Sequence, residues 1–402
     1  MAAKKFRKAY LTAFLAAPPF VCLLFLRRLI CLSPDNFIYP IGITFQVFAA
    51  VSYIIESSRN FSEKKDNPSD LVFYLAFFPV TFAGPIIRYP KFLSLLKEEN
   101  IVFDIKNCAL GARIFMTGFI KCAAVGFTLT DAFLKLSALD SDSPSLIVAI
   151  IMLAILFFSV YFSFSGYSDM GVGIARIFGV RLNLDSHPPF ASPTPAAYFT
   201  GFSRSLRGFI DEYFIFPLRR AVGGRHLYFA ESVIFTLTVY LIIGARPIAI
   251  PVAIPTVIFM FLTEKFSLKS RLAKKKGIQS LLAALNAAII SCSLVILFAN
   301  DGKLLAGYLR QITVFSSEYK FDRILIAIST IKLLFIFAVA FFTCVPKQRV
   351  ENFLRKKLSL NPGGSLDYAV LLILLALFAF TVLFFLPQYP EYDFRPFRFI
   401  YL

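Results

Sequence analysis

The chain has 402 residues, of which 58% are hydrophobic and 16% carry a charge. Charged residues make up about 25% of an ordinary soluble domain, so the composition excludes a soluble globule and predicts a membrane protein with several spans. The formal net charge of +18 does not indicate a nucleic-acid partner, because the basic residues lie in loops beside apolar runs, where membrane topology accounts for them.

Apolar runs close to the length of a membrane-spanning helix recur along the whole chain. Ten candidates lie at residues 10–26, 37–55, 71–87, 110–130, 146–162, 227–243, 248–262, 281–298, 324–344 and 368–386. The segments between them have the size of connectors, and none is interpreted as an independent soluble domain. We therefore predict one membrane-embedded domain, residues 1–402, with about 9–11 membrane helices.

Basic residues predict the orientation of the chain. Four of them within residues 4–8 precede the first run, and Arg27 and Arg28 follow it, so we expect an uncleaved helix that starts in the cytoplasm. The basic loops 265–276 and 347–357 are also expected to be cytoplasmic, and one last span then places the C-terminus outside. Seven runs precede the first of these loops, an odd number. Either one run does not cross, or the central polar stretch adds a crossing, or two runs form a hairpin.

The third run is interrupted by Pro79, Gly84 and Pro85. Two prolines and a glycine so close together break the helical hydrogen-bond ladder. We expect this segment to bend or to re-enter where protein shields its backbone.

A polar stretch, residues 161–218, interrupts the apolar pattern in mid-chain. A carboxylate and hydroxyls between membrane-length runs are unfavourable in hydrocarbon unless they line a cavity or contact other protein. Asp169 is expected either to line a wet tunnel or to pair structurally with Arg176 or Arg204. The polar residues at its centre are Ser165, Tyr167, Ser168 and Asp169.

Four passages form a pattern in which order and spacing are more specific than any one passage. They are PIGITFQ at 40–46, FPVTFAGPIIRY at 78–89, FSGYSDM at 164–170 followed by Gly179, and Tyr213 with Pro217 and Leu218; GFIK at 118–121 and PFRFIY at 396–401 add to them. Together they resemble the membrane-bound O-acyltransferase family, in particular its bacterial branch of alginate O-acetyltransferases and teichoic-acid D-alanyl transfer proteins. The resemblance is strongest over residues 37–265.

The resemblance implies an all-α, polytopic membrane fold, a ring of tilted helices around a central funnel. A thioester donor would enter this funnel from the cytoplasmic side and an acceptor hydroxyl from the other, and a histidine would take the proton of the attacking oxygen. The residues expected in the tunnel or in contact with substrate are Arg88, Ser165, Tyr167, Ser168, Asp169, Ser203, Ser205 and Tyr213.

The sequence departs from the family at its histidines. Where the family has a Trp-His pair, this chain has Phe202 and Ser203, and Val257 falls at the catalytic histidine. The chain has no histidine after His226. Valine cannot accept a proton, so the catalytic group is unknown from sequence, with Ser203 and Asp169 as the candidates.

The remaining polar candidates are interpreted as structural. His187 lies in a proline-rich loop and His226 in a basic loop, so each is interpreted as a loop residue, with replacement of the missing base as the alternative. Asp211 and Glu212 are interpreted as a solvated or interfacial helix end, because adjacent helix positions point in different directions. The six cysteines have no paired short spacing, so neither a disulfide framework nor a metal site is predicted.

These residues lead to an expected activity and an alternative. The first expectation is an O-acyltransferase of the cell inner membrane. It would transfer an acyl group, expected to be acetyl, from an acyl-CoA or acyl-carrier thioester toward a cell-envelope or exported polysaccharide. No bound cofactor is expected, and the partners are membrane lipid, the donor, the glycan and an extracytoplasmic acyltransferase or esterase-like protein. The alternative is a catalytically impaired relative that serves as a membrane scaffold or as an acyl- or lipid-binding subunit. A transporter, which broken helices would also fit, ranks below both.

Overall fold

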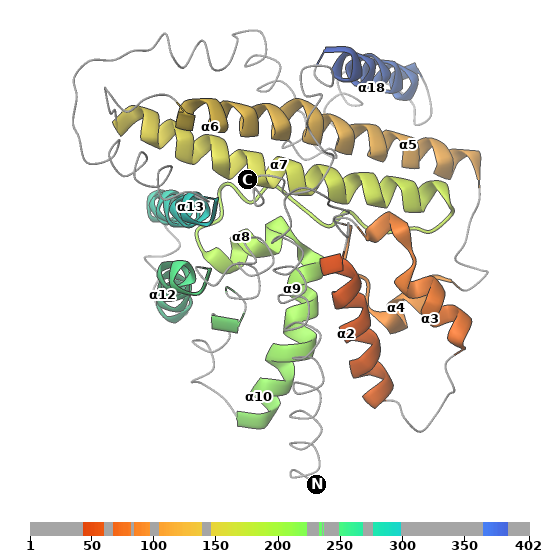
Figure 1. Ribbon diagram of the computed structural model, residues 1–402, viewed down its shortest axis with the longest axis horizontal. Coiled ribbons are helices and arrows are strands. Elements are labelled where there is room, and N and C mark those ends of the chain that lie inside the picture. The colour runs from red at the N-terminus through yellow and green to blue at the C-terminus, as the bar shows by residue number, and fades with distance from the viewer. Residues whose placement is uncertain are drawn as a thin grey trace, which may run out of the picture.

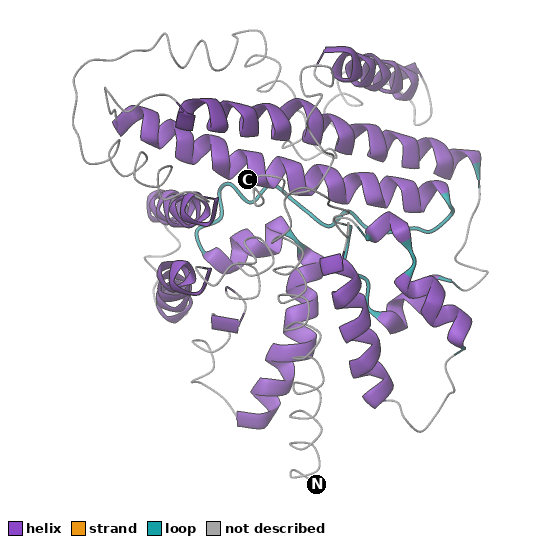
Figure 2. Ribbon diagram, in the orientation of Figure 1, coloured by secondary structure: helices purple, strands orange, loops and turns teal. Residues whose placement is uncertain are grey.

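The computed structural model describes residues 43–59, 67–81, 84–96, 104–138, 146–222, 233–234, 236, 249–267, 276–298 and 365–384. Every regular element within these ranges is a helix (Figure 2). The predicted runs at 10–26 and 324–344 lie outside the described residues, as does almost all of 227–243. The expected ring of helices around a funnel extends over these segments and stays a prediction.

Two long antiparallel rods form the middle of the structure (Figure 1). One consists of α5 (Ile105–Ile120), the π-helical segment η3 (Lys121–Phe127) and α6 (Thr128–Ala138), and the other is α7 (Leu146–Ile177). A helix of 32 residues such as α7 is about 48 Å long, which exceeds the about 30 Å of a hydrocarbon core. The span that the sequence predicted to end at residue 162 therefore continues through the polar residues of the central stretch.

Glycines allow the two rods to approach closely. A Cβ atom added to Gly118 would lie 2.6 Å from the carbonyl oxygen of Gly166, and one added to Gly111 would lie 2.7 Å from that of Gly173. Small residues at such crossings let helix backbones pack against each other in membranes. This contact brings polar side chains of one rod within reach of the other.

The chain leaves α7 through a left-handed glycine. Gly179 has φ 86°, a conformation that glycine adopts without steric penalty and that ends many helices. The amide of Val180 then donates to the carbonyl of Ala175 at 2.9 Å. From there the loop 180–194 runs back along α7 toward α8 (Pro195–Phe202) (Figure 1).

A third rod, made of short helices, follows α8. It consists of α9 (Arg204–Ile210), the π-helical segment η4 (Asp211–Ile215) and α10 (Phe216–Val222). Ser203 separates α8 from α9 in an extended conformation, and its hydroxyl accepts from the amide of Leu206 as the N-cap of α9. The two helices consequently meet at a corner whose backbone is held by this serine.

The N-terminal elements pack beside this rod. They are α2 (Ile43–Arg59), α3 (Pro68–Leu75), η1 (Phe78–Val80) and α4 (Tyr89–Leu95). The predicted break is present, because no single helix covers 71–87 and residues 84–88 have no regular secondary structure. The turn at Pro79 packs on α7 at Gly171, where an added Cβ would clash with the Pro79 carbonyl oxygen. The broken run is thus shielded by the central helices.

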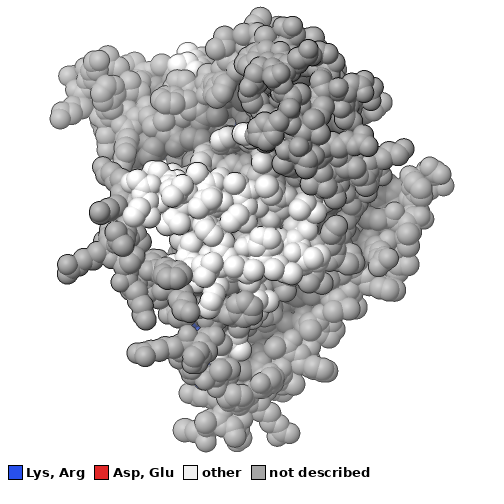
Figure 3. Space-filling view, turned by 90° about the vertical axis from the view of Figure 1, so that its left-hand side faces the viewer, with Lys and Arg blue, Asp and Glu red and all other residues white. Residues whose placement is uncertain are grey.

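The outer helices present apolar side chains. These helices are α12 (Ala249–Ser267), α13 (Lys276–Phe298) and α18 (Ser365–Phe384). Ile254, Ile258 and Leu262 are exposed at intervals of four residues and form a stripe along α12. The described surface visible in Figure 3 is almost free of charged side chains. Such a surface fits contact with lipid.

Three described segments are long and apolar enough to cross a membrane: Ile105–Phe133, Ala149–Ile177 and Gly277–Ile296. Shorter apolar helices lie in α2, α3, α12 and α18. The prediction of an all-helical, multi-pass membrane protein is confirmed. The division of residues 1–402 into one domain stays a prediction.

Candidate functional site

A group of buried and partly buried polar side chains lies where η3, α7, the loop 180–194 and α9 meet. We call it the central polar cluster. Its members are Lys121, Ser165, Asp169, Asp185, Ser186, Ser203 and Ser205.

The first half of the cluster is an ion pair between the two rods. The Nζ atom of Lys121 lies 2.5 Å from Oδ2 of Asp169, and the exposed fractions of these side chains are 11% and 4%. Lys121 is the first residue of the π-helical segment η3, a feature that occurs often at functional sites. Asp169 therefore does pair structurally, but the prediction of Arg176 or Arg204 as its partner is wrong.

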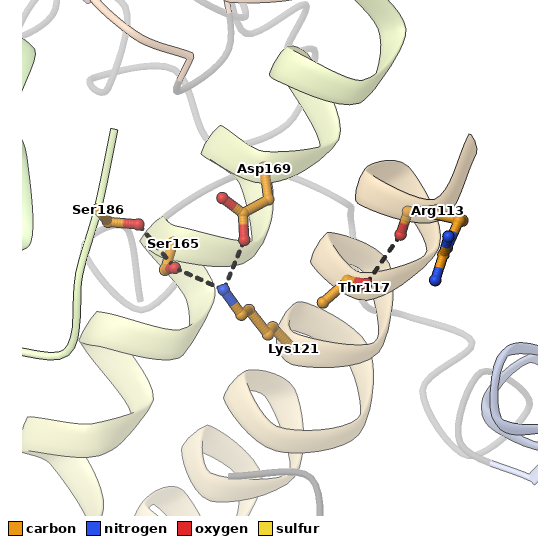
Figure 4. A network of polar contacts seen from close by, with 6 residues as sticks. All are labelled: Arg113, Thr117, Lys121, Ser165, Asp169 and Ser186. Carbon is orange, nitrogen blue, oxygen red and sulfur yellow. Dashed lines mark hydrogen bonds and ion pairs between the residues drawn. The ribbon is translucent and has the colours of Figure 1, made fainter. Parts of the chain in front are cut away.

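Serines extend this ion pair toward the loop. Lys121 also donates to Oγ of Ser165 at 3.3 Å, and the hydroxyl of Ser186 donates to the same oxygen at 2.7 Å (Figure 4). Ser165 and Ser186 are both buried. These contacts fix the loop against α7 at a point twelve residues before the helix ends.

The second half of the cluster is built around Asp185, which is 4% exposed. Its Oδ2 accepts from the hydroxyls of Ser203 at 2.6 Å and Ser205 at 3.0 Å, and its Oδ1 accepts from the Ser205 amide at 2.7 Å. Burial raises the pKa of Asp185 above its ordinary value of 3.8, although the three hydrogen bonds and the nearby charge of Arg204 oppose this. The acid thus holds the corner between α8 and α9.

The cluster continues to the broken third run. The amide of Ile86 donates to Oγ of Ser205 at 2.8 Å. Two residues further on, Arg88 forms an ion pair with Glu212 of η4, whereas the neighbouring Asp211 pairs with Arg207 at 2.9 Å. Asp211 and Glu212 do point in different directions, as the sequence predicted, but they lie inside the α9–η4–α10 rod, so the prediction of a helix end is wrong. Arg88 is half-exposed and joins α4 to the rod of short helices.

Tyr213 takes part in a separate buried contact. Its hydroxyl shares a hydrogen bond of 2.9 Å with the hydroxyl of Ser52 on α2. The Ser52 oxygen also accepts from the amide of Tyr89 at 3.0 Å. This group ties α2, α4 and η4 together and lies apart from the cluster's own hydrogen bonds.

The two remaining residues of the central stretch are buried on α7. Tyr167 is 7% exposed and hydrogen-bonds to Cys122, while Ser168 is fully buried. Among the described residues, the Ser168 hydroxyl has no hydrogen-bonding partner. Lining of a tunnel by either residue stays a prediction.

His187 lies at the exposed edge of the cluster. It follows Asp185 and Ser186, both buried, but its own side chain is exposed. Its amide donates to the carbonyl of Gly201 at 2.7 Å, so its backbone is held against α8. Desolvation against the surrounding protein lowers the pKa of His187 below its ordinary value of 6.5. The positive charges of Arg204 and Lys121 lower it further, and Asp169 and Asp185 act in the opposite direction.

Three known acyltransferases align with part of this chain. The probable alginate O-acetylase AlgI of Pseudomonas syringae pv. tomato is 30% identical over 188 residues, 46% of this chain and 35% of the relative. The peptidoglycan O-acetyltransferase of Helicobacter pylori is 29% identical over 150 residues, 37% of this chain and 28% of the relative. The teichoic acid D-alanyltransferase of Bacillus subtilis is 24% identical over 189 residues, 45% of this chain and 46% of the relative. No family model matches the chain.

This chain is a distant homologue of the membrane-bound O-acyltransferases. The resemblance that the motifs indicated is therefore confirmed. The matched part spans 35% and 36% of the length of the alginate O-acetylases from two species. The activities, substrates and partners of the full-length relatives are therefore only proposed for this chain.

The O-acyltransferase resemblance placed the catalytic histidine at Val257. This residue lies on α12 and is 6% exposed, which fits an apolar packing role. Among the described residues, no group of three histidine, cysteine or acidic side chains could hold a metal ion, and Cys108, Cys122 and Cys292 are free thiols.

Sequence reasoning found Ser165, Asp169, Ser203 and Ser205 but missed Lys121, Asp185 and Ser186. A lysine within an apolar run was a signal for the first, since such a charge must find a partner. Asp185 carried no such signal, because it lies in a loop. The cluster combines a buried cation, buried carboxylates and hydroxyls beside an exposed imidazole, which are groups that can orient an acyl group and move a proton.

Proposed function

We propose that this chain is a membrane-bound O-acyltransferase. It transfers an acetyl group from a thioester donor, acyl-CoA or an acyl carrier protein, to a hydroxyl of a cell-envelope or exported polysaccharide. The observation that carries the proposal is the homology to an alginate O-acetylase, a peptidoglycan O-acetyltransferase and a teichoic acid D-alanyltransferase. The names of all three relatives describe acyl transfer to a polymer.

The central polar cluster supports the proposal. Burying Lys121, Asp169 and Asp185 together is unfavourable unless each charge is compensated, and here each has partners within 3.0 Å. Fixed dipoles and charges of this kind can stabilise a tetrahedral oxyanion without reorganisation. We assign the acyl group to the neighbourhood of this cluster.

The proposal includes a location and partners. The chain resides in the cell inner membrane with its N-terminus in the cytoplasm, where the thioester is made, and its C-terminus outside. An extracytoplasmic acyltransferase or esterase-like protein completes transfer to the glycan. Labelling of single cysteines introduced near residue 5 and residue 395 of a cysteine-free variant, with a membrane-impermeant maleimide on intact cells, tests this orientation.

A second candidate function has its own support. Val257 occupies the position that the resemblance gives to the catalytic histidine, and it is buried. A chain that keeps the fold without this base would serve as a scaffold or as an acyl- or lipid-binding subunit.

The purified protein separates the two candidates. Release of free thiol and transfer to a soluble polysaccharide are measured with acetyl-CoA, for wild type and for Asp169→Ala and Ser203→Ala. Thr200→Ala is the matched control, because Thr200 is exposed on α8 and its hydroxyl bonds only to its own helix at Ala196. Turnover that falls in the first two variants and not in the control supports the enzyme. Binding of acetyl-CoA without turnover supports the scaffold.

A further inference from the structure

The loop 180–194 carries His187 at the edge of the central polar cluster. The imidazole takes no part in the hydrogen bonds and ion pairs that form the cluster. The charges of Lys121 on η3, Asp169 on α7 and Arg204 on α9 act on the His187 imidazole. Asp185 of its own loop is the fourth. Among the described residues it has no side-chain hydrogen bond in the structure.

The position of His187 is fixed although its ring is exposed. The two residues before it are both held, Ser186 by Ser165 at 2.7 Å and Asp185 by Ser203 at 2.6 Å, and its own amide donates to the carbonyl of Gly201. A side chain in a loop without such contacts would not keep a defined place relative to α7. This histidine therefore combines a held backbone with a ring that a substrate can reach.

We propose that His187 is the proton acceptor of the transfer reaction, in the place of the histidine that the chain lacks on α12. The inference rests on the proposed function. The acceptor oxygen forms a bond to the acyl carbon, and its proton passes to the imidazole. The C–S bond of the thioester then breaks, and the leaving sulfur takes that proton from the imidazolium to become the free thiol.

The surroundings favour this role. Desolvation and the charges of Arg204 and Lys121 keep the imidazole neutral over a wider pH range than in water, because each disfavours the protonated form. A neutral imidazole at neutral pH is the form that accepts a proton. Asp169 and Asp185 would stabilise the imidazolium once it forms, since both lower its energy by charge.

The first test uses turnover. His187→Gln removes the proton acceptor while keeping a polar side chain, and we expect kcat to fall about 10²–10⁴-fold with KM little changed. Arg204→Gln removes a nearby positive charge, so the pKa of His187 rises and the acid limb of the kcat profile moves to higher pH. Arg204→Lys keeps the charge and leaves the limb in place. A residue with only a structural role would not produce this pair of results.

The second test needs no turnover. The chain contains two histidines, so His226→Gln leaves a single imidazole for a titration by nuclear magnetic resonance with labelled histidine. We expect the pKa from that signal to lie below the ordinary value of 6.5, because partial desolvation and the charges of Arg204 and Lys121 disfavour the imidazolium, and to move upward in the Arg204→Gln background. A titration at or above the ordinary value would overturn the placement of His187 beside these cations.

The outcomes separate this inference from the proposed function. Absence of thiol release and of transfer by wild type with both acetyl-CoA and acyl carrier thioesters refutes the proposed function, and this inference with it. If wild type turns over and His187→Gln does so equally well, only the inference fails. Loss of activity in His187→Gln together with an unmoved acid limb in Arg204→Gln also overturns it, because the histidine would then be a structural part of the loop.

Discussion

Breaking the ion pair between Lys121 and Asp169 should destabilise the protein more than any surface charge change. The two side chains are 11% and 4% exposed and lie 2.5 Å apart. Removing one partner leaves the other charge buried without compensation, which typically lowers the free energy of unfolding by about 3–5 kcal/mol. We expect losses in this range for Lys121→Met and for Asp169→Leu. That is a large part of the about 5–15 kcal/mol by which native proteins are stable.

The double variant gives the sharper test. Replacing both partners by apolar residues of similar size is often close to neutral, so Lys121→Met combined with Asp169→Leu should be more stable than either single variant. The control is the ion pair of Asp131 and Lys135 on α6, whose side chains are 19% and 58% exposed. Lys135→Met should change stability by only about 0.5 kcal/mol or less.

The assay is denaturation by sodium dodecyl sulfate in mixed micelles, followed by far-ultraviolet circular dichroism. The chain has no tryptophan, so helical signal is preferable to intrinsic fluorescence. Single variants at Lys121 and Asp169 that lose no more stability than Lys135→Met would refute the reasoning. So would a double variant whose loss equals the sum of the two single losses, since that would show no coupling between the charges.

Two further predictions use the same assay. Gly118→Ala places a methyl group 2.6 Å from the Gly166 carbonyl oxygen and should lower stability by about 1–3 kcal/mol or prevent folding. Gly208→Ala, with nothing within 4 Å of the added atom, should be neutral or stabilising by up to about 1 kcal/mol; equal effects at the two glycines would contradict the close helix contact. Ser203→Ala removes the N-cap of α9 and a donor to Asp185 and should lower stability by about 1 kcal/mol or more. Ser203→Thr, which keeps the hydroxyl, should recover most of it, and a threonine variant as unstable as the alanine variant would argue against the cap.

The membrane class and the helical fold followed from the sequence, because lipid imposes a simple rule on composition. Backbone polar groups must be satisfied within each span, so apolar runs of sufficient length are predictable as helices. The break at Pro79 was equally predictable, since proline removes a helical donor wherever it stands. The resemblance to the membrane-bound O-acyltransferases followed from short motifs whose order and spacing are visible in the linear chain.

The length of α7 was not predictable from its composition. The apolar pattern weakens after residue 162, yet the helix continues to Ile177, because its polar side chains find partners on η3 and on the returning loop. Those partners come from residues far apart in sequence: Lys121 pairs with Asp169 across 48 positions and Ser186 bonds to Ser165 across 21. No local rule states which of several cations a buried carboxylate will meet.

The sequence by itself determined that this chain is a membrane protein, that its spans are helices, and which polar residues would need buried partners. The tertiary structure alone decided which residues are those partners. Close packing at Gly118 and Gly166 brings Lys121 to Asp169, and the left-handed turn at Gly179 sends the loop back along α7. That return brings His187 under the electrostatic influence of four charged side chains. The physical reason is that burial fixes how many polar partners a side chain requires, whereas only the packing of the whole chain determines which residues supply them.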